Sequence, residues 1–161
     1  MFYLDLFRAL DKHRVNYVLV GGLAMNLHGV PRMTMDVDLV LALSEDNLDR
    51  FIASAQDLGL TPMAPVALSA LKDPEQRREW VEHKHLIAFA LQPATSGAPT
   101  VDILLAPTLD IEAALARAVT RDLGDIPVSV AAIEDMITLK KAAGRQQDQA
   151  DLVHLEQLRG H

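Results

Sequence analysis

Hydrophobic positions along the chain follow two patterns. Segments with an apolar residue every three or four positions are typical of amphipathic helices, and short continuous apolar runs between them are typical of buried strands. The first pattern predicts helices over 2–14, 22–28, 45–58, 75–82, 107–119 and 133–143, with a last helix that begins near residue 148. The second pattern predicts strands over 17–20, 36–43, 85–91, 100–105 and 126–131. Segment 60–72 contains two prolines and is predicted to be a loop or an edge piece of the sheet.

The order of these elements predicts the fold class. Strands and helices interleave, and the turn residues in 92–99 predict a hairpin between the third and fourth strands. A hairpin requires antiparallel pairing, whereas strands joined by helices tend to pair in parallel. We therefore expect an α/β (or α+β) fold with a mixed β-sheet and flanking helices. The length of 161 residues suits one domain over 1–161 with its own core.

Composition narrows the classes of function. Half of the residues are apolar and the formal net charge is −7, which argues against a broad basic surface and therefore against extended binding to duplex DNA. The chain has no cysteine, so it has neither disulfides nor thiolate metal ligands. It shows no signal-peptide pattern and no uncharged apolar run of about 20 residues. These features predict a cytoplasmic protein with no membrane contact.

Two carboxylates stand out in the second predicted strand. Asp36 and Asp38 occupy alternate positions in an otherwise apolar run, so their side chains are expected on one face, roughly 6.5–7 Å apart along the chain. Two like charges at that separation raise each other's cost of ionisation. A hard divalent cation with oxygen ligands, above all Mg²⁺, relieves this cost.

Residues that surround this pair are candidates for anion binding. Gly21 and Gly22 join the first strand to a short helix, where they permit a positive φ or a close backbone approach, and the free N–H groups of that helix favour phosphate. The alternative is a plain strand-to-helix turn. Arg32, in the loop before the acidic pair, is either a phosphate clamp or a solvated loop residue.

Two more positions have polar residues where the pattern calls for apolar ones. Asp102 interrupts the apolar strand 100–105, either as a further metal ligand or as a salt-bridged structural acid. Lys140 lies in the middle of the apolar stripe of helix 133–143. Its side chain either extends outward along its own stem or points into a polar cleft between helix and sheet. Asp148 and Asp151 are equally explained as functional acids or as acids in the first turn of a helix.

The order Gly21-Gly22, short helix, Arg32-x-Thr34-x-Asp36-x-Asp38 resembles the nucleotidyltransferase superfamily that includes DNA polymerase beta. The form with Arg and Thr before the acids is similar to bacterial branches that include abortive-infection and toxin–antitoxin transferases. The tail also resembles these bacterial transferases, in which a helix lysine reaches the nucleotide phosphates; here its residues are Lys140, Arg145, Asp148 and Asp151.

This resemblance implies a metal-assisted transfer of a nucleoside monophosphate. Asp36, Asp38 and Asp102 would be the catalytic carboxylates and would hold two Mg²⁺ ions, with Asp102 also accepting or orienting the proton of the attacking hydroxyl. The nucleoside triphosphate would be bound by six further residues: Gly21, Gly22, Arg32, Thr34, Lys140 and Arg145. The acceptor hydroxyl could belong to a protein, a tRNA end or a small molecule.

One departure from the family pattern concerns the glycine turn. Many members have serine at its second position, where the hydroxyl contacts phosphate, and this chain has Gly22. An alternative function is therefore a catalytically weak, nucleotide-binding or antitoxin-like protein of the same fold, with a toxin or antitoxin as its partner. A third interpretation is a small α/β domain in which the acids are coincidental.

Overall fold

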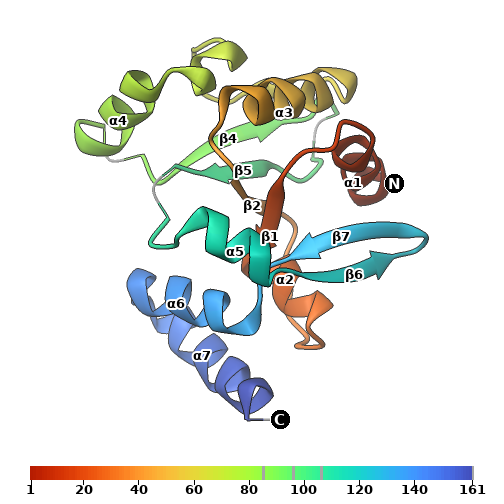
Figure 1. Cartoon of the computed structure of the whole chain (residues 1–161), viewed down its shortest axis with the longest axis vertical. Helices are drawn as coiled ribbons and strands as arrows, with labels where there is room; N and C mark the ends of the chain where they lie inside the picture. The colour runs from red at the N-terminus through yellow and green to blue at the C-terminus, as the bar shows by residue number, and fades with distance from the viewer. Residues whose placement is uncertain (85, 96, 106, 161) are drawn as a thin grey trace.

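The computed structural model describes residues 1–84, 86–95, 97–105 and 107–160. Its centre is a mixed β-sheet with the strand order β3-β4-β5-β2-β1-β7-β6 (Figure 1). The strands are β1 (Tyr17–Val20), β2 (Val37–Leu41), β3 (Thr61–Pro62), β4 (Ala88–Gln92), β5 (Val101–Leu104), β6 (Val119–Leu123) and β7 (Ile126–Val130). The predicted fold class, a mixed sheet with flanking helices, is confirmed.

Helices surround this sheet. They are α1 (Phe2–Lys12), α2 (Gly21–Leu27), α3 (Glu45–Asp57), α4 (Pro74–Glu82), α5 (Ile111–Arg117), α6 (Ile133–Ala143) and α7 (Gln146–Arg159), with a short 3₁₀ helix at Leu68–Lys72. Helices α6 and α7 pack against each other at the lower end of the molecule, and α1 lies against β7 and α3 (Figure 1). Among the helices of the described chain, none combines the length and hydrophobicity that a bilayer crossing requires.

Strand β2 has the central position for function. It pairs antiparallel with β1, where Val20 faces Asp38, and parallel with β5, where Asp38 faces Asp102. The C-terminal end of β1 and the N-terminal ends of β2 and β5 therefore lie together, at one end of these central strands. The predicted hairpin is also confirmed, because β4 and β5 pair antiparallel, with Ala90 opposite Asp102.

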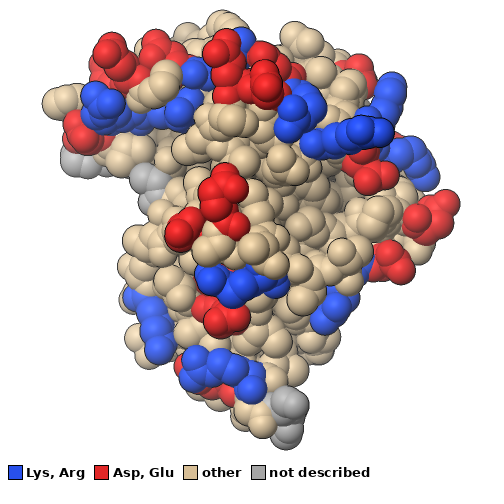
Figure 2. Space-filling view, in the orientation of Figure 1, with Lys and Arg blue, Asp and Glu red and all other residues tan. Residues whose placement is uncertain are grey.

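The central strands are apolar because both faces of the sheet are covered. All four residues of β1 are buried, and the buried side chains of sheet and helices form one hydrophobic cluster that includes Phe7, Phe51 and Leu39. On the face shown in Figure 2, lysine and arginine side chains occur in small groups among acids, without a continuous basic surface.

The sequence patterns missed β6 and placed several boundaries wrongly. The helix predicted over 107–119 is only Ile111–Arg117, and Val119 already belongs to β6. Strand β6 lies at the edge of the sheet and its three central residues are exposed and polar, so it lacks the apolar pattern of a buried strand. Segment 60–72 does contain an edge strand, β3, in which Pro62 is tolerated because an edge strand needs fewer hydrogen bonds.

Other boundaries differ by a few residues. Strand β2 begins at Val37, so Asp36 immediately precedes it. The predicted strand 85–91 is β4, which begins at Ala88, and His85 lies outside the described residues.

Asn47 fastens together the two loops at the opposite ends of β1 and β2 from the acidic pair. It is fully buried, and its Oδ1 accepts a hydrogen bond from the Asn16 N–H at 2.7 Å. Its Nδ2 donates to the carbonyl oxygens of Asn16 at 2.9 Å and Ala42 at 2.8 Å. One amide side chain thus satisfies three backbone groups and fixes the β1–β2 pair.

We predict that Asn47→Ala lowers the free energy of unfolding by about 2 kcal/mol, because the buried Ala42 carbonyl and the Asn16 N–H lose their partner, whereas the Asn16 carbonyl keeps its bond from the Ala42 N–H. Gln56→Ala is the matched control, since Gln56 is an exposed amide residue on the same helix, and its effect should stay within about 0.5 kcal/mol. Urea unfolding of both variants measures the difference. Equal effects would mean that the Asn47 hydrogen bonds contribute nothing to stability.

Candidate active site

Carboxylates from two neighbouring central strands meet at the end of the sheet where both strands begin. Asp38 is the second residue of β2 and Asp102 is the second residue of β5, and the register sets them directly side by side. Burial, followed by the charges of Asp102 and Asp36, raises the pKa of Asp38 to about 6. Burial and the charge of Asp36 also raise the pKa of Asp102. The pair therefore favours a proton or a cation between its oxygens.

Asp36 approaches this pair from the loop before β2. Its side chain is exposed, and its Oδ1 accepts a hydrogen bond from the backbone N–H of Thr100 at 3.2 Å. The hydroxyl of Thr100 in turn contacts Asp102 Oδ1 at 3.4 Å. Thr100 was not among the predicted site residues. Its position two residues before Asp102, on the same side of an extended chain, was the available signal.

The glycine turn makes room for two of the site's side chains. Gly21 has a φ of +74°, and a Cβ atom on it would lie 2.1 Å from Asp38 Oδ2. A Cβ atom on Gly22 would lie 2.8 Å from both Cβ and Oγ1 of Thr34. The Thr34 hydroxyl thus fills the space beside position 22, where the family pattern considered above would place a serine hydroxyl. Close approach requires glycine at both positions, and the positive φ adds a second reason at Gly21.

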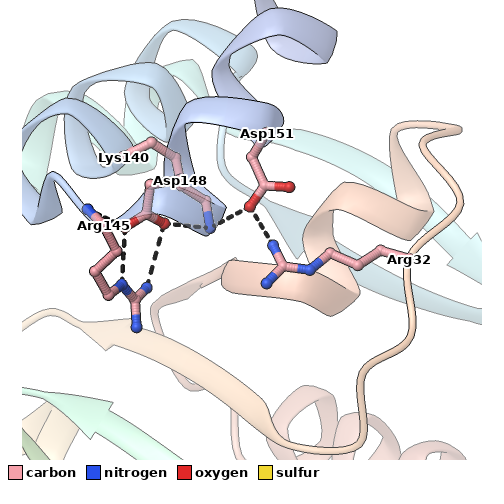
Figure 3. A network of polar contacts seen from close by, with 5 residues as sticks. All are labelled: Arg32, Lys140, Arg145, Asp148 and Asp151. Carbon is pink, nitrogen blue, oxygen red and sulfur yellow. Dashed lines mark hydrogen bonds and ion pairs between the residues drawn. The ribbon is translucent and has the colours of Figure 1, made fainter.

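Positively charged residues next to this turn form a network with two acids (Figure 3). Lys140 Nζ on α6 lies 2.9 Å from Asp151 Oδ2 and 3.2 Å from Asp148 Oδ1 on α7. Arg145 Nε donates to Asp148 Oδ2 at 2.8 Å, and Arg32 pairs with Asp151. The network joins the loop before β2 to the last two helices.

Burial decides between the alternatives for these residues. Lys140 is only 7% exposed, so its side chain does not extend outward but points into the polar space between α6 and α7. Asp148 is fully buried in the first turn of α7, where its Oδ2 accepts a hydrogen bond from the Arg145 N–H at 3.1 Å, so it caps the helix and also pairs with Lys140. Burial alone raises the pKa of Asp148, but hydrogen bonds from Arg145 and Lys140 outweigh it and lower that pKa to about 2.

The network and the carboxylates belong to the same site. The positive charge of Lys140 lowers the pKa of Asp38 and so offsets part of the increase that burial and neighbouring acids cause. Hydrogen bonding to Asp148 raises the pKa of Arg145, and the charge of Asp38 raises it further. The structure thus brings the predicted glycines, Thr34, the three carboxylates and the three cations together around the end of β1.

The donor set fits Mg²⁺ in one particular way. In the described part of the chain, no three Asp, Glu or His side chains form a ready cluster of metal ligands. Mg²⁺ in phosphoryl-transfer sites is usually held by one or two carboxylates, with waters and substrate phosphates as the remaining ligands. Asp38 and Asp102 are adjacent, and their mutual repulsion is only partly offset by Lys140. They therefore provide this kind of site.

Comparison with known families gives this site a context. The sequence profile described as "Nucleotidyl transferase AbiEii toxin, Type IV TA system" matches residues 4–157. The chain belongs to the AbiEii nucleotidyltransferase family. The match runs from α1 into α7 and therefore includes the glycine turn, the carboxylates and the cation network. No curated protein matches the sequence.

Solved structures show the same fold. The crystal structure of ANT(2″)-Ia in complex with adenylyl-2″-tobramycin superposes with a TM-score of 0.60 at 16% identity, covering 96% of this chain and 84% of that one. A candidate nucleotidyltransferase from Thermotoga maritima gives 0.58 at 13% identity, covering 99% and 92%. An antigenic nucleotidyltransferase-like protein from Paracoccidioides brasiliensis gives 0.55 at 19% identity, covering 93% and 71%.

These findings confirm the nucleotidyltransferase superfamily, its toxin–antitoxin branch and the transferase class that the sequence predicted. They agree with the geometry, in which acids and cations converge on a glycine turn. The chain is therefore not a small α/β domain unrelated to this family. The individual roles of the site residues, the metal and the acceptor are the subject of the proposal below.

We predict that Gly21→Ala is far more damaging than a left-handed backbone alone explains. Gly59 is the matched control, because its φ is +68° and a Cβ atom there meets nothing within 4 Å. Gly59→Ala should lower the free energy of unfolding by about 1–2 kcal/mol. Gly21→Ala should lower it by at least about 1 kcal/mol more, because its Cβ collides with Asp38.

A double-mutant cycle checks the cause. Adding Asp38→Ala to Gly21→Ala should recover most of the excess loss in urea unfolding, since it removes the colliding carboxylate. No recovery would show that the backbone of Gly21, and not its contact with Asp38, sets the requirement for glycine.

We also predict that Asp38→Asn stabilises the metal-free protein at neutral pH. A folded-state pKa of about 6, above the ordinary 3.8, means that ionised Asp38 opposes folding. The penalty is absent below pH 4, develops between pH 4 and 6, and is complete at pH 7, where it amounts to about 1–3 kcal/mol.

The measurement is urea unfolding of both proteins at pH 4 and pH 7 in EDTA. The advantage of Asp38→Asn should appear at pH 7 and shrink at pH 4. Asp122→Asn on the exposed edge strand β6 is the matched control and should change little at either pH. A variant that is less stable than the unaltered protein at pH 7 would contradict the proposed repulsion.

Proposed function

We propose that this AbiEii-family protein is a Mg²⁺-dependent nucleotidyltransferase that moves a nucleoside monophosphate from a nucleoside triphosphate to a hydroxyl acceptor. The observation that carries the proposal is the pairing of Asp38 with Asp102 beside a glycine turn and within electrostatic reach of Lys140. Acids on one side and cations on the other suit a substrate with a metal-bound polyphosphate.

The cation network is the proposed binding region for phosphate. Its three cations, Arg32, Lys140 and Arg145, share two acids, Asp148 and Asp151, so one positive charge is left over. The acids hold the cations in fixed positions, and a fixed cation loses less entropy when it binds an anion. The N–H groups at the Gly21–Gly22 turn and the Thr34 hydroxyl lie next to this region and would add uncharged donors.

The carboxylates would hold the metal and receive the proton. Asp38 and Asp102 would be ligands, with Asp36 close enough to contribute charge or a further ligand to a second ion. Bound Mg²⁺ would neutralise charge on the phosphates and favour ionisation of the attacking hydroxyl. Asp102 has a raised pKa, which suits a group that accepts or orients the hydroxyl proton.

The family description also bears on partners. It names a toxin of a type IV toxin–antitoxin system, which supports a toxic transfer reaction and an antitoxin that counteracts it. A protein, a tRNA end and a small hydroxyl compound remain the three acceptor classes. An active toxin is favoured over an antitoxin-like binding protein because the three carboxylates and their balancing cations are all present.

The test is transfer of label from each of the four α-³²P nucleoside triphosphates in Mg²⁺, with a cell extract as the source of acceptor. We predict labelled product with at least one nucleotide and a loss of at least about 100-fold in Asp38→Asn, because one metal ligand is removed. Asp122→Asn on β6 should transfer at the unaltered rate.

A binding measurement separates an inactive protein from a misassigned one. Mg²⁺ with a non-hydrolysable triphosphate should raise the thermal midpoint of the unaltered protein and not that of Asp38→Asn. Binding without transfer to any acceptor would replace the enzyme by the nucleotide-binding alternative. Absence of both binding and transfer would refute the proposed function altogether.

A further inference from the structure

A hollow of about 470 Å³ lies next to Thr100, the residue that contacts Asp36 and Asp102. Its walls come from three segments: Thr61 in β3, Gln92 at the end of β4, and the described residues of the hairpin that leads to Thr100. A volume of this size suits a small-molecule group such as a sugar or a nucleoside. None of the functions assigned above uses this hollow.

Thr100 connects the hollow to the reacting groups. It lines the hollow, its N–H donates to Asp36, and its hydroxyl contacts Asp102. A ligand in the hollow would thus be separated from the carboxylates by one side chain. Thr100 therefore belongs both to the wall of the hollow and to the surroundings of the carboxylates.

The strand order fixes the two sides of the site. Across the sheet the order is β3-β4-β5-β2-β1, with the hollow at β3–β5, the carboxylates on β5 and β2, and the glycine turn after β1. The cations of the network come from the loop before β2 and from α6 and α7 (Figure 3). The hollow and the cation network therefore lie on opposite sides of Asp38 and Asp102.

Phosphoryl transfer requires the attacking group and the leaving group to approach from opposite sides of the metal site. In an in-line displacement the attacking and leaving oxygens lie on opposite sides of the α-phosphorus. Pyrophosphate is the leaving group and needs cations, so it belongs on the side of Lys140 and Arg32. The attacking hydroxyl must then arrive from the side of the hollow.

The chemistry of the walls indicates what kind of acceptor fits. The lining residues that the structure describes are uncharged, with threonine hydroxyls, the Gln92 amide and the small apolar surfaces of Ala94 and Ala98. A phosphate group there would lie near Asp36 and Asp102 without a cation to pair with it. An ammonium group would find no carboxylate among the described residues of the wall. Hydroxyl and amide groups suit a neutral ligand with hydroxyls.

We infer that this hollow is the acceptor subsite and binds a neutral, hydroxyl-bearing ring, such as a sugar or a nucleoside. The inference rests on the proposed function. In the reaction, the acceptor oxygen forms a bond to the α-phosphorus, the bond to pyrophosphate breaks, and the hydroxyl proton passes to Asp102. Thr100 is the residue between acceptor and carboxylates.

Uridine is the probe, because it is neutral and carries ring hydroxyls. Amide chemical shifts of Thr61, Gln92 and Thr100 should change when uridine is added to the unaltered protein. Ala98→Trp and Thr61→Trp fill the hollow from two different walls, so at least one folded variant is expected. Each should weaken uridine binding at least 10-fold, whereas Ala116→Trp, on the exposed surface of α5, should leave it unchanged.

Transfer kinetics provide the second readout. With uridine as acceptor and a labelled triphosphate as donor, the filled variants should raise the KM for uridine at least 10-fold and leave the KM for the triphosphate within about twofold. Unchanged uridine kinetics in both folded variants would overturn the acceptor assignment. Stronger shifts with tobramycin, a polycation, or with uridine monophosphate than with uridine would overturn the neutral class.

The two readouts separate the two proposals. If no triphosphate gives transfer to any acceptor, the proposed function fails, whatever uridine does in the hollow. If transfer to the natural acceptor in an extract occurs but uridine neither binds nor competes with it, only the inference about the hollow fails.

Discussion

The repulsion between Asp38 and Asp102 is the constraint around which the rest of the site is arranged. Two carboxylates on paired strands are forced together by the hydrogen bonds of the sheet, which give neither side chain freedom to withdraw. The surroundings limit the cost in two ways. Gly21 gives Asp38 room for its oxygens, and the charge of Lys140 acts on it from α6. Folding therefore maintains a local excess of negative charge that a bound cation would relieve.

Local sequence patterns were sufficient for the parts of the site that lie close together along the chain. The spacing of Asp36 and Asp38, the glycines before them and the apolar flanks of Asp102 identify the strands and the acids. The position of Lys140 on an apolar helix face indicated that its side chain has an unusual environment, and the structure shows that it is buried with two acids. These features depend on short-range periodicity, which a sequence displays directly.

The rest depended on contacts between distant segments. That Asp102 lies beside Asp38 is a matter of strand register, and the pairing of Arg32 with Asp151 joins residues 119 positions apart. Asp148 was equally compatible with a simple first-turn acid, because nothing in its neighbourhood along the chain shows that Lys140 on α6 pairs with it. Strand β6 was missed because an edge strand with exposed polar residues has no apolar pattern of its own. Thr100 was missed in part because its contact with Asp36 is made by a backbone N–H, which every residue other than proline has.

The ion network of Figure 3 also has a consequence for the time at which the enzyme matures. The glycine turn, Arg32 and the first two acids are synthesised more than a hundred residues before Asp151. A nascent chain that has already formed the strands up to β5 holds all three carboxylates but has no Lys140, Arg145, Asp148 or Asp151. Such a chain has the acidic half of the site without most of the basic half. Full assembly of the site thus awaits the docking of α7, so the acidic half of the site is made and folded before most of its positive charges exist.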